Sequence, residues 1–179
     1  MRAPESLETS RLFLCRPAHA DAESIFRRYA SDPVVTRYLS WPTHRTVEDT
    51  HAFISWDGNE WQTWPGGSYL IFPRGEDHLL GGTGLSFKSA SVAVTGYVFA
   101  QDAWGQGFAT EALQAMVGVA RLSGVKRLEA VCHAQHAASA RVLEKCGFVR
   151  EKIDAAQSEF PNLIPKTLSD VFAYAREVP

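Results

Sequence analysis

The chain has 179 residues, of which 45% are apolar, and this size is typical of a single domain that buries a sufficient core without disulfide support. Its formal charge of −2 provides no field to hold a polyanion, and no long apolar run or leader pattern marks a membrane or secreted protein. We therefore expect one soluble, cytoplasmic domain over residues 1–179, with neither nucleic acid nor membrane as a partner.

The three cysteines, Cys15, Cys132 and Cys146, are odd in number, widely spaced and set in apolar surroundings. A disulfide framework or zinc cluster would need a different pattern, so we interpret them as small core residues. The pair His133 and His136 has no third ligand at a sensible spacing, and we expect no metal.

In the N-terminal half, residues 7–16 alternate around Leu12 and Leu14 and predict a strand that ends at Pro17. A short helix is expected after Asp21 and a second one over residues 47–56. A turn-rich stretch follows over residues 61–67. Three strands are then predicted, over residues 68–72, 79–87 and 92–100.

The second half contains the clearest helix, over residues 106–122, because its apolar residues recur four apart on one face. Gly124 is a plausible cap, and residues 127–133 have a strand pattern, which predicts a parallel pair with residues 92–100 joined by a crossover helix. A short helix over residues 137–146 should end at Gly147 with Phe148 as its hydrophobic contact, and a last strand should contain Phe172 and Tyr174.

Two glycines one residue apart, Gly105 and Gly107, lie between a predicted strand and the clearest helix. Glycine permits close backbone approach, and the free amides and positive dipole end of the helix attract an anion. The same pattern is compatible with a purely structural turn. A triphosphatase loop is excluded because Gly-Lys-Ser/Thr is absent, and a dinucleotide fold stays a distant second because Thr110 and His133 occupy its small and acidic positions.

Two motifs carry a resemblance to a family: Trp104-Gly-Gln-Gly-Phe-Ala-Thr-Glu-Ala-Leu and His136-Ala-Ala-Ser-Ala-Arg-Val-Leu-Glu-Lys-Cys-Gly-Phe. In this order the chain resembles the GNAT acetyltransferases, and more narrowly their RimJ/RimL type, which acetylates the N-termini of ribosomal proteins. The similarity extends from Leu7-Glu-Thr-Ser-Arg-Leu to Phe160-Pro-Asn and Asp170-Val-Phe-Ala-Tyr. The central motifs are specific, whereas the terminal ones add weak support.

The resemblance implies a mixed α/β (α+β) fold with a mostly antiparallel sheet of six or seven strands and about four helices. It also implies acetyl-CoA in a V-shaped split between residues 92–100 and residues 127–133. The residues implied at acetyl-CoA are Val98, Phe99, Ala100, Trp104, Gly105, Gln106, Gly107, Phe108, Ala109, Thr110, His136 and Ser139. Trp104 and His136 depart from the pattern, which commonly has Arg or Gln and Asn at these positions.

The implied reaction is acetyl transfer to a primary amine by direct attack through a tetrahedral intermediate. It needs a neutral amine, a stabilised oxyanion and a proton for the thiolate. Backbone amides over residues 98–100 are candidates for the oxyanion. Ser139 is implied as the acid, although it could simply cap its helix. Glu151 is the candidate base, with Glu129 and His133 as rivals, and an exposed salt-bridging carboxylate is an equally good reading of Glu151.

The acceptor stays open among a protein N-terminus, a polyamine, an aminoglycoside and an amino acid. Four tryptophans before the middle strands either shape an acceptor pocket or pack under loops: Trp41, Trp56, Trp61 and Trp64. A different class of function, a non-catalytic acyl-CoA sensor, is the main alternative, and His136 is its best support. An edge strand near the C-terminus could also pair two copies in a homodimer.

Overall fold

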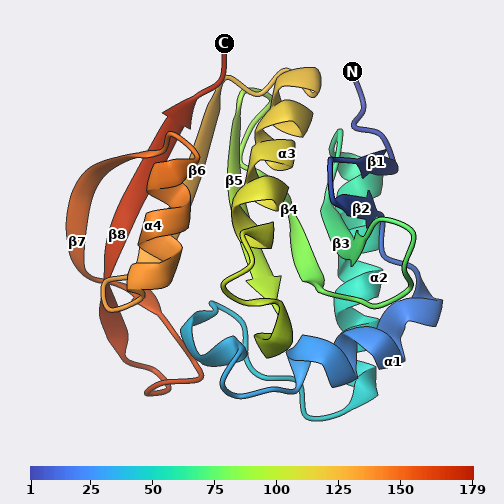
Figure 1. Cartoon of the computed structure of the whole chain (residues 1–179). Helices are drawn as coiled ribbons and strands as arrows, with labels where there is room; N and C mark the ends of the chain where they lie inside the picture. The colour runs from blue at the N-terminus through green and yellow to red at the C-terminus, as the bar shows by residue number, and fades with distance from the viewer.

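The computed structural model describes the backbone of all 179 residues and the side chains of residues 1–151 and 158–179. One sheet of eight strands has the order β1-β2-β3-β4-β5-β6-β8-β7 (Figure 1). The strands are β1 (Ser6–Glu8), β2 (Leu12–Cys15), β3 (Ser68–Pro73), β4 (Gly81–Phe87), β5 (Val92–Phe99), β6 (Arg127–His133), β7 (Val149–Glu159) and β8 (Leu168–Glu177). The helices are α1 (Ala22–Ile25), which continues as a π-helix over Phe26–Ala30, α2 (Val47–Thr63), α3 (Phe108–Leu122) and α4 (Ala137–Lys145).

The expected mixed fold with a mostly antiparallel sheet is confirmed, but the sheet has eight strands rather than six or seven. The segment predicted as one strand over residues 7–16 is a tight hairpin, in which Leu7 pairs with Leu14. The second additional strand, β7, has a polar sequence without the apolar alternation that predicts a strand. Helix α2 also extends to Thr63, so the stretch expected to form turns begins as helix.

The two faces of the sheet are covered by different helices. On one face, Tyr69 and Ile71 belong to the same buried cluster as the apolar side of α3, whereas Leu70 between them packs with Ile25 of α1 and Ile54 of α2. Because successive side chains of a strand point to opposite faces, α3 and α1–α2 lie on opposite sides of the sheet. Figure 1 shows α3 and α4 together in front of the sheet.

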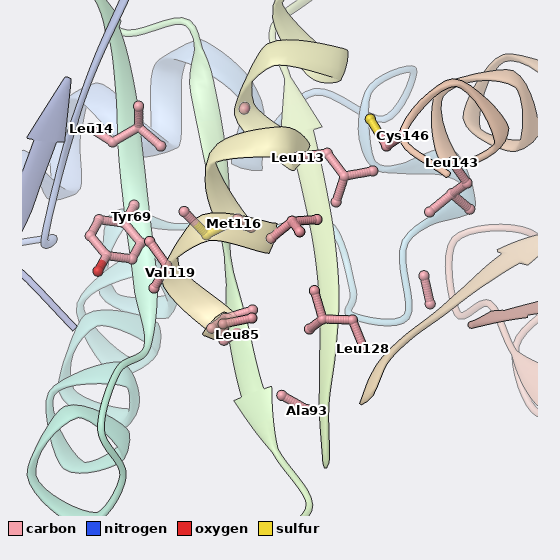
Figure 2. Packing of buried hydrophobic residues seen from close by; sticks show 14 of the residues in the cluster. Leu14, Tyr69, Leu85, Ala93, Leu113, Met116, Val119, Leu128, Leu143 and Cys146 are labelled. Atoms are coloured by element: carbon pink, nitrogen blue, oxygen red, sulfur yellow. The ribbon is translucent and has the colours of Figure 1, made fainter. Parts of the chain in front are cut away.

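The larger cluster lies between α3, α4 and the middle strands (Figure 2). Leu113 and Met116 of α3 are fully buried, as is Leu128 of β6, and Leu85 of β4 is 4% exposed. Burial of each such side chain contributes about 1.5–3 kcal/mol. Leu143 and Cys146 attach α4 to the same cluster, so the helix that follows the glycine turn and the helix that follows β6 share one core.

Strands β5 and β6 are the parallel pair, and they part after a short contact. They pair at Val92 with Arg127, Ala93 with Leu128 and Val94 with Glu129. Beyond this point β5 continues against β4 to Phe99, and β6 continues against β8 to His133. The V-shaped split is therefore confirmed, and its open end lies beside the start of α3 and α4.

Glycines end two helices as expected. Gly124 after α3 and Gly147 after α4 have φ values of 81° and 76°. After α4, the amide of Phe148 donates to the carbonyl oxygen of Leu143 at 3.1 Å, as in a Schellman motif. Among the described residues, no helix is both long enough and apolar enough to cross a bilayer.

Candidate active site

The glycine turn at the start of α3 is open to solvent. Gly105 and Gly107 have φ values of 74° and 82°, a region that residues with a Cβ rarely adopt. Gly107 is the N-cap residue and has no side chain with which to cap the first turn of α3. The exposed backbone of residues 105–107 and the first amides of the helix therefore face outward and are able to receive an anion.

A hairpin from the N-terminus supports this turn. Arg11 donates from Nη1 to the carbonyl oxygen of Gln106 at 2.9 Å, and its guanidinium lies 4.8 Å from the centroid of the Phe108 ring. This guanidinium lies beside the glycine turn and holds its backbone, while the Glu111 carboxylate, 2.7 Å from Arg11 Nε, balances its charge. Arg11 belongs to the sequence motif Thr9-Ser-Arg. Its partner Gln106 is 95 residues away, so no local pattern predicts this contact.

The carboxylate of Glu111 fixes the hairpin to α3. It accepts hydrogen bonds from Thr9 Oγ1 at 2.6 Å, from Ser10 Oγ at 2.8 Å and from the Arg11 backbone amide at 2.8 Å. Arg11 Nε donates to its second oxygen at 2.7 Å. Burial alone would raise the pKa of Glu111, but these hydrogen bonds outweigh it and lower the pKa to about 2.

Trp104 does not present a charged group at the first position of the turn. Its indole Nε1 donates to the carbonyl oxygen of Phe99 at 2.7 Å, and 49% of the residue is exposed. The side chain thus links the end of β5 to the glycine turn. Any contact with an anion at this position comes from the backbone.

The end of β5 presents fewer free amides than the sequence suggested. The amide of Ala100 donates to the carbonyl oxygen of Leu80 at 2.9 Å. In an antiparallel ladder the amide direction alternates, so the amide of Val98 also points to β4, whereas those of Tyr97 and Phe99 point into the split. Of the three residues proposed for the oxyanion, only Phe99 offers its amide, and Tyr97 joins it.

A cavity of about 590 Å³ passes through the split. Its walls come from both sides of the sheet, since Trp41 and Trp56 belong to the α1–α2 side and His136 and Ser139 to α4. Ligands can therefore reach the same space from opposite faces. This geometry suits a reaction between two substrates.

Ser139 and Tyr97 meet across the split. The two hydroxyl oxygens are 3.0 Å apart, and the Tyr97 hydroxyl donates to the Ser139 carbonyl oxygen at 3.2 Å. Since Tyr97 has one proton, the Ser139 hydroxyl is then the donor to Tyr97 Oη. Burial raises the pKa of Tyr97, so it stays neutral. Tyr97 was missed by the sequence, because nothing local links residues 42 positions apart.

His136 begins α4 and lines the cavity. Its ring stacks on Tyr38 at 4.8 Å, and Tyr38 also contacts His133 at 4.9 Å. Burial, followed by the neighbouring His133, lowers the pKa of His136, so the imidazole is neutral near pH 7. Within the described residues, no group of three His, Cys, Asp or Glu side chains is arranged to hold a metal ion.

His133 lies between aromatic rings beside the cavity. The backbone amide of Gln135 donates to its Nδ1 at 3.1 Å, so the neutral ring carries its proton on Nε2. The ring also meets Phe160 edge-on at 4.9 Å. This is the environment of a hydrogen-bonded histidine at a strand end, rather than that of a base free to meet a substrate.

Glu151 and Glu129 lie at the closed end of the split. Arg127 Nη2 is 2.5 Å from Glu151 Oε2, and Arg127 Nε is 3.1 Å from Glu129 Oε1. Lys88 Nζ is also 2.7 Å from Glu129, and these hydrogen bonds lower the pKa of Glu129. Neither carboxylate lines the cavity. In this structure Glu151 is an ion-paired, exposed carboxylate outside the cavity, so its role as the base stays a prediction.

The four tryptophans divide between the two expected roles. Trp61 is 3% exposed and meets Tyr69 edge-on at 5.3 Å. Trp64 stacks on Phe87 at 5.7 Å. These two are packing residues, whereas Trp41 and Trp56 line the cavity.

Comparison with known proteins agrees with this geometry. The sequence profile described as "Acetyltransferase (GNAT) domain" matches residues 11–149. The chain is 32% identical over 152 residues to the uncharacterized N-acetyltransferase YoaA of Bacillus subtilis, covering 82% of this chain and 84% of that protein.

Solved structures share the fold at lower identity. The ribosomal L7/L12 α-N-protein acetyltransferase RimL in complex with coenzyme A has a TM-score of 0.84 and 21% identity, covering 97% of this chain and 98% of that one. The microcin C7 self-immunity acetyltransferase MccE in complex with acetyl-CoA and AMP has a TM-score of 0.85 and 18% identity, with 98% and 97% covered.

Proposed function

Because this chain belongs to the GNAT family of acetyltransferases, we propose that it transfers the acetyl group of acetyl-CoA to a primary amine. The observation that carries the proposal is the open glycine turn at the head of α3 beside a split that a cavity crosses from face to face. Acetyl-CoA, when bound, supplies an activated thioester. The residues of the chain bind it, orient the acceptor and move protons.

The binding role falls to the start of α3. Backbone amides of residues 105–110 would bind the diphosphate, and Arg11 holds the turn through the carbonyl oxygen of Gln106. The amides of Tyr97 and Phe99, turned into the split, are placed to bind the thioester oxygen. His136 takes the place where the family commonly has Asn, at the N-terminus of α4.

Ser139 acts on the departing thiolate by donating a hydrogen bond from its hydroxyl to the sulfur. Its hydroxyl lies in the split, and Tyr97 holds it by two contacts at 3.0 and 3.2 Å. A thiol has a pKa of about 8.5 and an alcohol is a much weaker acid, so the hydroxyl keeps its own proton, and the thiolate takes its proton from solvent. Tyr97 acts through Ser139 and is a positioning residue.

Removal of a proton from the acceptor amine falls to His136. The Glu151 and Glu129 carboxylates are bound to cations, whereas the His136 imidazole lines the cavity and is kept neutral by burial. An α-amine has a pKa near 8, so a weak base suffices. His136→Asn, which restores the commoner residue, should keep acetyl-CoA affinity. The acid limb of the kcat profile, which lies below about pH 6.5 because the His136 pKa is lowered, should disappear in this variant.

The experiment measures thiol release from acetyl-CoA with a panel of small amines and N-terminal peptides. Ser139→Ala and Tyr97→Phe should lower kcat about tenfold or more with little change in acetyl-CoA affinity. Ser123→Ala is the control, since its buried hydroxyl has no hydrogen-bond partner in the described structure and its residue caps the far end of α3. Binding of acetyl-CoA without turnover of any amine would refute the proposal and favour a sensor.

The α-amine of a peptide or a small primary amine is the proposed acceptor. RimL, a protein of the same fold, is named for acetylation of an α-amine. A cavity of about 590 Å³ with an open end admits a small amine or a chain terminus.

A further inference from the structure

The acceptor side of the cavity has carboxylates in its wall, and its described lining has neither lysine nor arginine. The carboxylates are those of Asp57 and Glu60 of α2. We propose that the acceptor is a primary amine with an apolar, aromatic-sized group and without a carboxylate or phosphate. This inference rests on the proposed function and names the substrate class of the same site.

Aromatic rings supply the surface for such a group. Trp41, Phe53 and Trp56 line the cavity on the α1–α2 side, together with Tyr29 and Ile25. The Phe53 and Trp56 ring centroids are 6.2 Å apart, and Trp56 is 51% exposed. Offset or edge-on packing of an aromatic group on these rings would be favourable, and their faces attract an ammonium ion before it loses its proton.

An acceptor with a carboxylate would bind less favourably in this cavity. Its carboxylate would lose water on entering the cavity and would find carboxylates rather than a cation in the wall. The buried Asp57 carboxylate is 2% exposed and accepts the Ser68 amide at 2.8 Å, so it is fixed in place. An ammonium group, in contrast, gains from the same charges.

Three of the four arginines next to cavity residues have other contacts, and the fourth, Arg45, is exposed and does not line the cavity. Arg16 Nη1 is 3.1 Å from Glu5, and Arg28 Nη2 is 2.7 Å from Asp102. Arg37 stacks against the Tyr38 ring at 5.2 Å without lining the cavity. These pairings leave free amino acids and phosphorylated amines without a counterion in the wall.

The test uses two pairs of acceptors that differ by a carboxylate: phenylalaninamide with phenylalanine, and tryptamine with tryptophan. Thiol release is measured with the full chain at pH 8 and saturating acetyl-CoA. We expect kcat/KM to be at least tenfold higher for the member without the carboxylate in both pairs. The carboxylate changes amine basicity in opposite senses in the two pairs, so basicity alone cannot produce this result. Methylamine, which has no apolar group, should have a KM at least tenfold above that of tryptamine.

Substitutions of charged residues show which side chain causes the preference for acceptors without a carboxylate. Glu60→Gln should reduce the preference for tryptamine over tryptophan several-fold, and Glu60→Lys should reduce it further. Glu76→Gln, which changes an exposed carboxylate in the turn after β3, is the matched control and should leave the ratio unchanged. Arg37→Gln should also leave it unchanged.

Equal or faster acetylation of phenylalanine and tryptophan would overturn the inference while leaving the proposed function intact. Loss of their acetylation in Arg37→Gln would overturn it too, because it would reveal a cation that serves the acceptor. Bound acetyl-CoA with no transfer to any of these amines or to peptides would refute the proposed function and this inference together.

Discussion

Replacement of Glu111 by Gln should remove a pH-dependent part of the stability of this protein. The carboxylate is 14% exposed and accepts hydrogen bonds from three residues of the first hairpin. A pKa that falls from 4.5 to about 2 corresponds to about 3 kcal/mol of stabilisation at neutral pH. Because Arg11 is 48% exposed and partly screened, we expect about 2 kcal/mol to be measured.

The sign of the pH dependence follows from the lowered pKa. The folded protein binds this proton more weakly than the unfolded chain, so the stabilisation is complete above the unfolded pKa of 4.5 and is lost as the pH falls to about 2. Urea unfolding of the wild type and Glu111→Gln should therefore give a difference of about 2 kcal/mol at pH 7. This difference should shrink steadily below pH 4.5.

The matched control is Glu8→Gln in the same hairpin. Glu8 pairs with Arg74 at 3.1 Å, but both side chains are more than half exposed, so the change should be below about 0.5 kcal/mol. Acetyl-CoA affinity should fall in Glu111→Gln alone, because the hairpin supports the glycine turn through Arg11. A difference between wild type and Glu111→Gln that is the same at pH 7 and pH 3 would refute this reasoning.

Three further outcomes can be checked with single variants. Gly107→Ala should destabilise the protein by about 1 kcal/mol in thermal melts and weaken acetyl-CoA binding, because Gly107 has a positive φ. Gly118→Ala is the control: it lies inside α3 with no atom near the added Cβ, so it should stabilise the protein by about 0.5–1 kcal/mol. Glu151→Gln should leave kcat within about twofold, and a loss of about 100-fold would show that it is the base. Asn162→Ala should raise the acceptor KM several-fold at unchanged acetyl-CoA affinity, because its amide donates to the Trp41 carbonyl oxygen at 2.8 Å; an unchanged KM would contradict this.

Local patterns were sufficient for the elements that carry the cofactor turn. The apolar stripe of α3 predicted a helix whose Ala112, Met116 and Ala120 are fully buried. Gly105 and Gly107 predicted a tight turn before the helix, and in the structure both lie in that turn with positive φ. Both features depend on residues within a few positions of one another, so a local sequence pattern is sufficient to predict them.

The contacts that could not be predicted from the sequence join residues that are far apart along the chain. Ser139 was identified by resemblance, but its contact with Tyr97 needs the split to bring β5 and α4 together. The pairing of Glu151 with Arg127 needs the order β6-β8-β7, which no local pattern specifies. A carboxylate cannot be distinguished as base or ion-pair partner until the neighbouring strands are known.

The short pairing of β5 with β6 makes the middle of this sheet resemble two exposed edges. Three residue pairs join the strands, and beyond them the backbone groups of each strand that face the split lack a neighbouring strand. Such edges invite an extended partner that carries amides of its own. A substrate arm with that chemistry would serve as a short extra strand, so occupancy of the split should join the two halves of the sheet and raise the melting temperature.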